Sequence, residues 1–170
     1  GDFMLIWVSL PRVLRRQLRP VAAADYWLKS PLRRFIARKV FNMVLVARQS
    51  GEPQAAVLQM AEAMDGGADL LIFPEGTRNA NDNVLLQPFK SGLYHLAMAR
   101  PECELLPVWI HNIQRVLPKG KLLPVPMLCS VRFGQPFRGG DFTEKEDFLA
   151  FAQATLLAQQ PVLRQEERGL

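Results

Sequence analysis

Short apolar runs alternate along the chain with stretches whose apolar residues recur at helical spacing. The short runs are typical of buried strands and fall near residues 20–24, 43–47, 69–73, 104–110 and 128–133. The helical patterns cover residues 3–9, 31–40, 53–64, 91–99 and 143–158. This alternation predicts a layered α/β fold with a largely parallel central sheet flanked by helices.

Local signals mark several helix ends. Ser30 followed by Pro31 predicts an N-cap and a first-turn proline, and Thr143 with Glu146 predicts a capping box. The glycine pair at 66–67 predicts the end of the third helix. These signals agree with the helix boundaries that the apolar pattern indicates.

Length and composition fit one enzyme domain. A chain of 170 residues, 49% of them hydrophobic, can bury a substantial core. No internal repeat or low-complexity linker divides it, so we expect one domain over residues 1–160 and a polar tail over 161–170. No run of about 18 apolar residues occurs in the sequence, and none of its segments is predicted to span a bilayer.

A loop that suits anion binding comes after the predicted strand at 69–73. Pro74 cannot donate to a strand ladder and should end the strand, while Gly76 allows a ligand to approach the main chain. Arg78 offers a planar fork of donors to a phosphate. Open α/β sheets bind ligands at this edge. The alternative is an ordinary surface ion pair between Glu75 and Arg78 across a turn.

Four blocks of sequence resemble one enzyme family. Residues 73–78, Phe-Pro-Glu-Gly-Thr-Arg, resemble the signature of the glycerolipid acyltransferases, the family that includes 1-acylglycerol-3-phosphate acyltransferase. Residues 87–93 are similar to the family's Phe-Lys-x-Gly segment, and residues 105–110 to its proline-containing strand. Residues 41–48 resemble its strand that ends in an arginine. The blocks stand in family order over about residues 2–135.

One element of the family pattern is missing from this sequence. Members carry Asn-His-x-x-x-x-Asp, and the first eleven residues resemble the family sequence just after that histidine, so Asp2 matches the aspartate and the histidine is expected four residues before Gly1. His95 and His111 have no aspartate five residues on, and we expect structural or solvated roles for both. We interpret the chain as a catalytic domain truncated within its first motif, inactive without the histidine. Alternatively, Asp2 is a terminal residue or a helix cap.

The resemblance implies an O-acyltransferase. It would move a fatty acyl group from acyl-CoA or acyl-carrier protein to the free hydroxyl of a lysophospholipid, first of all 1-acylglycerol-3-phosphate, giving phosphatidic acid in phospholipid synthesis. The thioester is a co-substrate, and no cofactor is implied. Two alternatives stay open: a different acceptor, such as glycerol-3-phosphate or another lysolipid, and a non-catalytic lipid- or phosphate-binding remnant.

The matched positions receive roles from the resemblance. Arg48 and Arg78 would bind the acceptor phosphate, with Lys90 as a further cation. Thr77 would stabilise the loop or donate to the phosphate, and Gly76 would permit close approach.

The remaining matches concern the reacting groups and the acyl chain. A base within hydrogen-bond reach typically contributes about 10²–10⁴ in rate, and Asp2 would orient that base. Glu75 would either hydrogen-bond the acceptor or hold Arg78 in its fork geometry. Pro107 would lie in the acyl-chain region.

Positive charge is concentrated in the first 50 residues, which hold ten Lys or Arg and two Asp and leave a net charge of −3 for the rest. Two clusters stand out: Arg12, Arg15, Arg16 and Arg19, and Arg33, Arg34, Arg38 and Lys39. A basic amphipathic stretch suits an anionic membrane surface or an acidic acyl carrier protein. The alternative is a solvated cationic face. No nucleic-acid-binding motif accompanies the charge, which argues against a nucleic-acid partner.

The cysteines and histidines give no sign of a metal site or a disulfide. Cys103 and Cys129 are isolated, and no His cluster has ligand spacing. We expect reduced thiols and a location on the cytoplasmic face of a membrane, either peripheral or anchored by a segment outside this sequence.

Overall fold

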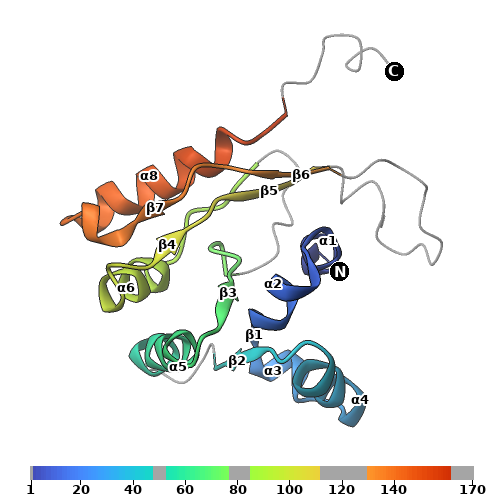
Figure 1. Cartoon of the computed structure of the whole chain (residues 1–170). Coiled ribbons are helices and arrows are strands. Elements are labelled where there is room, and N and C mark those ends of the chain that lie inside the picture. Colours follow the sequence, from blue (N-terminus) through green and yellow to red (C-terminus); the bar gives the residue numbers. More distant parts are fainter. Residues whose placement is uncertain (1, 48–52, 77–84, 112–129, 162–170) are drawn as a thin grey trace.

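The computed structural model describes residues 2–47, 53–76, 85–111 and 130–161 (Figure 1). The first two ranges contain the helices α1 (Asp2–Ser9), α2 (Arg12–Gln17), α3 (Ala24–Trp27), α4 (Pro31–Phe35) and α5 (Pro53–Asp65), the π-helical turn η1 (Ile36–Val40), and the strands β1 (Leu18–Ala23), β2 (Val44–Val46) and β3 (Asp69–Leu71). The last two ranges contain α6 (Gly92–Ala99), α8 (Lys145–Leu157), the 3-10 turn η2 (Gly139–Asp141), and the strands β4 (Glu104–Leu105), β5 (Val108–His111), β6 (Ser130–Phe133) and β7 (Phe137–Arg138).

A parallel three-stranded sheet has the order β2-β1-β3. The two partners pair with different halves of β1: Val21 lies opposite Val44, and Leu18 lies opposite Asp69. Helix α5 packs on β2 and β3, and α3 packs on β1 and β2 (Figure 1). The predicted α/β fold with a parallel central sheet and flanking helices is therefore confirmed.

Two antiparallel pairs complete the described strands. β5 pairs with β6 and β4 pairs with β7. The predicted strand at 104–110 is interrupted at Leu106 and Pro107, because proline has no N–H to continue a ladder. Of the predicted strand at 128–133, residues 130–133 are described and form β6. The apolar pattern did not predict α2, α3 or β7, which have two to six residues each.

The core joins the sheet to α5 and α6. Val44, Met60, Ala61 and Leu96 are buried together, and partly buried residues such as Val21 pack against them. Burying an aliphatic side chain of this size contributes about 1.5–3 kcal/mol. This cluster fixes α5 before β3 and α6 after the loop that leaves β3, so it sets the position of that loop.

An aromatic cluster holds the later elements. Phe148 is fully buried, and its ring lies 5.6 Å from that of Phe142 and 5.7 Å from that of Tyr94. Phe137 and Phe151 complete the cluster, with their ring centroids 5.1 Å apart. Offset and edge-on ring contacts of this kind add about 0.5–1.5 kcal/mol beyond area burial. They attach α8 to α6 and to the β4–β7 pair.

The helix-end predictions met different outcomes. The Ser30 hydroxyl accepts from the Arg33 N–H at 3.2 Å, which confirms this cap. The glycine pair at 66–67 also ends α5 as predicted: the N–H groups of Gly67 and Ala68 donate to carbonyls of the last helical turn, and Gly67 has φ +89°. The predicted capping box at Thr143 is wrong. Glu144 is the N-cap of α8 and makes no side-chain cap bond, because the helix begins two residues after Thr143.

Candidate active site

The loop after β3 makes a tight turn at the predicted motif. The Gly76 N–H donates to the Phe73 carbonyl at 3.0 Å, and Gly76 has φ +71°. A left-handed conformation costs a residue with a Cβ about 1–2 kcal/mol, so glycine is the residue that this turn requires. The backbone conformation therefore explains why residue 76 is a glycine, and the close approach of a ligand stays a prediction.

Two hydrogen bonds join this loop to the segment that precedes α6. A Glu75 carboxylate oxygen accepts from the Gln87 N–H at 2.6 Å, and the Pro74 carbonyl accepts from the Lys90 N–H at 2.9 Å. Hydrogen bonds to a charged acceptor are shorter and stronger than neutral ones. Glu75 is half-buried, so little water competes for this bond. Two sequence blocks separated by about ten residues thus form one structural unit.

Lys90 lies directly over Gly76. A Cβ built on Gly76 would stand 3.1 Å from the Lys90 Cγ, so the lysine stem runs across the glycine. Lys90 is exposed, so its ammonium group is accessible to an anion from solvent. The structure brings together Glu75, Gly76 and Lys90 of the predicted site.

Other predicted residues are placed only in part. Arg48, Thr77 and Arg78 lie outside the described residues. Asp2 begins α1, but the structure does not describe its side chain. Pro107 is buried between β4 and β5, where its carbonyl accepts from the Gly134 N–H at 2.8 Å. The roles given to these five residues stay predictions.

Neither histidine belongs to the unit formed by the loop and the segment before α6. His95 lies exposed on α6, with its ring 5.5 Å from that of Tyr94. His111 ends β5 opposite Ser130.

A salt bridge joins the C-terminal ends of α5 and α6, the helices before β3 and after the loop. The Arg100 guanidinium binds both oxygens of Asp65, with Nε to Oδ1 at 2.7 Å. Hydrogen bonding to Arg100 lowers the pKa of the Asp65 carboxyl, and the same bond raises the pKa of Arg100. Asp65 ends the helix before β3 and Arg100 caps the helix after the loop, so the pair ties the two helices that flank the site.

Sequence reasoning missed two features near the sheet. The Glu75 bond to Gln87 uses a backbone donor, which no residue type reveals. The second feature is a hollow beside β2, lined in part by Arg19 and Arg38, and the two basic clusters were the sequence feature that pointed toward it.

Among the described residues, no group of three or more His, Cys, Asp or Glu is arranged to hold a metal ion. No described helix is both long and apolar enough to cross a bilayer.

Comparison with known families decides the class of chemistry. The acyltransferase family model matches residues 1–111. The chain belongs to the acyltransferase family. In this acyltransferase chain, the matched range includes the parallel sheet, the loop after β3 and α6. No curated protein and no solved structure matches the chain in the corresponding comparisons.

Proposed function

We propose that the acyltransferase moves a fatty acyl group from acyl-CoA or acyl-carrier protein to the free hydroxyl of 1-acylglycerol-3-phosphate, giving phosphatidic acid. The observation that carries the proposal is the fixed loop of Glu75, Gly76 and Lys90 in a chain of the acyltransferase family. This loop leaves a parallel strand at its carboxyl end, where open α/β sheets bind ligands.

The proposed reaction is direct transfer. A base takes the proton of the acceptor hydroxyl while its oxygen attacks the thioester carbonyl. The tetrahedral intermediate then collapses: the new C–O bond remains, the C–S bond breaks, and the leaving thiolate takes up a proton from the protonated base. Backbone N–H groups near the turn are candidate donors for the oxyanion. The sequence contains no His-x-x-x-x-Asp, so in this proposal Asp2 orients a histidine that lies outside it.

The proposed binding site for the acceptor phosphate combines cationic side chains with a backbone turn that the phosphate can approach closely. Arg48 and Arg78 bind the phosphate, Thr77 supports the loop, and Lys90 adds its ammonium from across Gly76. The left-handed turn at Gly76 and the exposed Lys90 side chain support this assignment, because they leave the loop open to an anion. Glu75 then acts as a brace through Gln87, and its bond explains why a carboxylate stands in an anion-binding loop.

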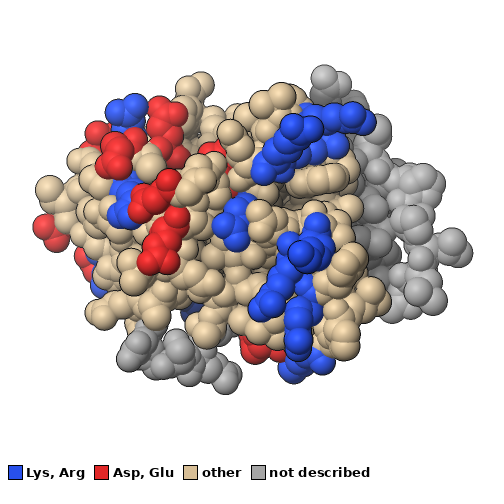
Figure 2. Space-filling model, turned by 60° about the horizontal axis from the view of Figure 1, so that its bottom comes forward, with Lys and Arg blue, Asp and Glu red and all other residues tan. Residues whose placement is uncertain are grey.

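A membrane-facing surface completes the proposal. Leu32, Phe35 and Val40 are 68%, 59% and 51% exposed in and beside a run that includes Arg33 and Arg34. On the face shown in Figure 2, a group made mostly of Lys and Arg lies on one side, while most of the visible Asp and Glu, with a few Lys and Arg among them, lie on the other. Exposed apolar residues among cations suit an anionic lipid surface, where the lysophospholipid acceptor resides. An acyl carrier protein is a second anionic partner for the same surface.

The test is acyl transfer measured with the 170-residue chain and with a version extended upstream through Asn-His-x-x-x-x-Asp. Transfer to 1-acylglycerol-3-phosphate in the extended form alone is the expected result. Transfer by both forms would overturn the role given to the upstream histidine. Transfer by neither, or only to another acceptor, would overturn the assignment of 1-acylglycerol-3-phosphate.

The proposed role of Arg78 in binding the acceptor phosphate is tested separately in the extended form. Arg78→Ala should lower kcat/KM for 1-acylglycerol-3-phosphate by about 10- to 150-fold, because a charged hydrogen bond contributes about 1.5–3 kcal/mol. Use of uncharged 1-acylglycerol should not change, and Lys145→Ala on α8 serves as the control for loss of a cation elsewhere. Equal kinetics for wild type and Arg78→Ala would remove Arg78 from the site.

A further inference from the structure

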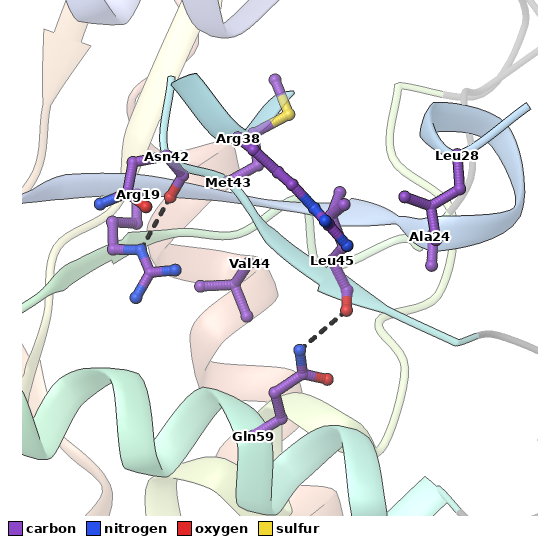
Figure 3. A pocket seen from close by; sticks show the side chains of 9 residues that line it. All are labelled: Arg19, Ala24, Leu28, Arg38, Asn42, Met43, Val44, Leu45 and Gln59. Atoms are coloured by element: carbon purple, nitrogen blue, oxygen red, sulfur yellow. Dashed lines mark hydrogen bonds between the residues drawn. The ribbon is translucent and has the colours of Figure 1, made fainter. Parts of the chain in front are cut away.

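A hollow of about 320 Å³ lies beside β2, one of the two edge strands of the described parallel sheet. Its walls come from β1, from η1 and the residues after it, from α5, and from Ala24 and Leu28 at α3 (Figure 3). Arg19 and Arg38 line it, and none of its lining residues is acidic. In the close view the two arginines stand on either side of Val44.

Neither arginine is neutralised by the described part of the chain. Arg19 donates through Nε to the Asn42 carbonyl at 2.7 Å, which fixes its guanidinium without using the two terminal nitrogens. The Arg38 side chain makes no hydrogen bond or salt bridge with any described residue. The salt bridges among the described residues join Asp65, Glu104 and Glu146 to their partners, all outside residues 2–47. Within the described structure, the hollow therefore holds two cationic groups with no anionic partner.

An unusual backbone puts these groups in place. The helix that begins at Pro31 widens into the π-helical turn η1, where the Phe41 N–H donates to the Ile36 carbonyl at 3.1 Å. Asn42 then takes φ 48°, and the Met43 N–H donates back to the Ala37 carbonyl at 2.8 Å. Asn is one of the few residues that tolerate this conformation. The turn aims the Asn42 carbonyl at Arg19, and π-helical turns occur frequently at functional sites.

The other lining groups suit an anionic ligand with a less polar part. The Gln59 side-chain amide donates to the Leu45 carbonyl at 2.9 Å. This bond occupies a β2 carbonyl oxygen that would otherwise face an anion in the hollow. Ala24 and Leu28 add apolar surface at one end. The site thus offers guanidinium donors beside a small apolar wall, and planar guanidinium groups match phosphate oxygens well.

We propose that this hollow is a second anion site that binds a phosphate ester through Arg19 and Arg38. It shares no residue with the loop after β3, and it does not depend on the acceptor that the enzyme uses. Two sources carry the same chemistry: the phosphorylated nucleotide of a coenzyme A thioester, and the headgroup of an anionic phospholipid.

Titration calorimetry of the 170-residue chain at low salt tests this site. The probes are adenosine 3′,5′-bisphosphate, monomeric dihexanoyl phosphatidylglycerol and inorganic phosphate. Arg38→Ala should weaken binding of the probe that binds best by about tenfold, as expected for loss of one charged hydrogen bond. Because Arg38 has no partner among the described residues, this change should leave the fold intact, which a circular dichroism melt checks. Lys39→Ala is the matched control, since Lys39 has the same charge in the same turn but does not line the hollow.

Each outcome of the calorimetry either supports or overturns the proposed anion site. Preference for the bisphosphate assigns the nucleotide, preference for the lipid assigns the headgroup, and equal binding assigns the phosphate alone; each supports the site if Arg38→Ala weakens it and Lys39→Ala does not. Equal losses in the two variants would show that only general positive charge attracts the probes, and this would overturn the proposal. Binding of no probe at millimolar concentration would also overturn it.

Discussion

Replacing Gly76 with alanine tests the backbone turn of the candidate site. Gly76 has φ +71°, and the turn is closed by its own N–H on the Phe73 carbonyl. An added Cβ meets two obstacles: the left-handed conformation itself, and the Lys90 Cγ at 3.1 Å. Lys90 is an exposed flexible side chain that can shift by a few tenths of an ångström, so the conformational cost should dominate.

The expected magnitude comes from that conformational cost. A left-handed non-glycine residue costs about 1–2 kcal/mol. With a typical urea m-value of about 1–3 kcal/mol/M, Gly76→Ala should lower the urea midpoint by about 0.3–2 M with m unchanged. The measurement is equilibrium unfolding monitored by circular dichroism. In the extended form, acyl transfer per folded molecule should also fall, because the turn positions Glu75 and packs against the Lys90 side chain.

Three matched variants separate the causes. Gly67 has φ +89° and no atom within 4 Å of an added Cβ, so Gly67→Ala should lose similar stability but keep acyl transfer. Gly92→Ala, on α6 with open space and no positive φ, should be neutral or gain a few tenths of a kcal/mol. The double variant Gly76→Ala with Lys90→Ala should recover little. Wild-type stability in Gly76→Ala, or full recovery in the double variant, would refute the conformational argument.

Two further predictions concern the bonds around the site. Glu75→Ala should speed hydrogen exchange of the Gln87 amide by about tenfold or more, while Glu75→Gln retains part of the protection; unchanged exchange would contradict the brace. Asp65→Asn should lower the melting temperature at pH 7. Because Arg100 lowers the folded-state pKa of Asp65, the pair stabilises the protein above the unfolded carboxyl pKa of about 4, and the stabilisation disappears as the pH falls through the lower folded pKa. The melting temperatures of wild type and Asp65→Asn should therefore converge in acid, and a constant difference down to about pH 2 would be evidence against the salt bridge.

The sequence predicted the elements that carry strong periodicity. The strand at 69–73 and the helices at 53–64 and 91–99 appear within two residues of their predicted bounds. Their apolar faces meet in the core of Val44, Met60 and Leu96, so the pattern and the tertiary packing agree. The break at Pro107 results from a missing N–H and was open to prediction from the residue alone.

The rest depended on contacts that no local pattern encodes. The Glu75 bond to the Gln87 N–H joins residues twelve apart through a backbone group, so the choice between acceptor contact and Arg78 contact could not be made from residue types. The π-helical turn at 36–40 has the same amphipathic composition as an α-helix, so the composition does not reveal the bonds that distinguish it, from the Phe41 N–H to the Ile36 carbonyl and from the Met43 N–H to the Ala37 carbonyl. At the start of α8, Thr143 and Glu146 have capping-box spacing, but Glu144 takes the N-cap position.

The hydrogen bond from the Gln87 N–H to Glu75 changes the electrostatics expected for this loop. A carboxylate beside a phosphate would repel it, and at an effective dielectric of about 20 two unit charges about 4 Å apart interact by about 4 kcal/mol. The Gln87 N–H, at 2.6 Å, takes up part of the charge on one Glu75 oxygen and holds that oxygen against the 85–91 segment. The Lys90 side chain runs across Gly76 and adds a cation to the same loop without forming a salt bridge to Glu75. An anion can therefore approach the loop from the Lys90 side while the carboxylate serves the backbone, which is the arrangement that the proposed acceptor site requires.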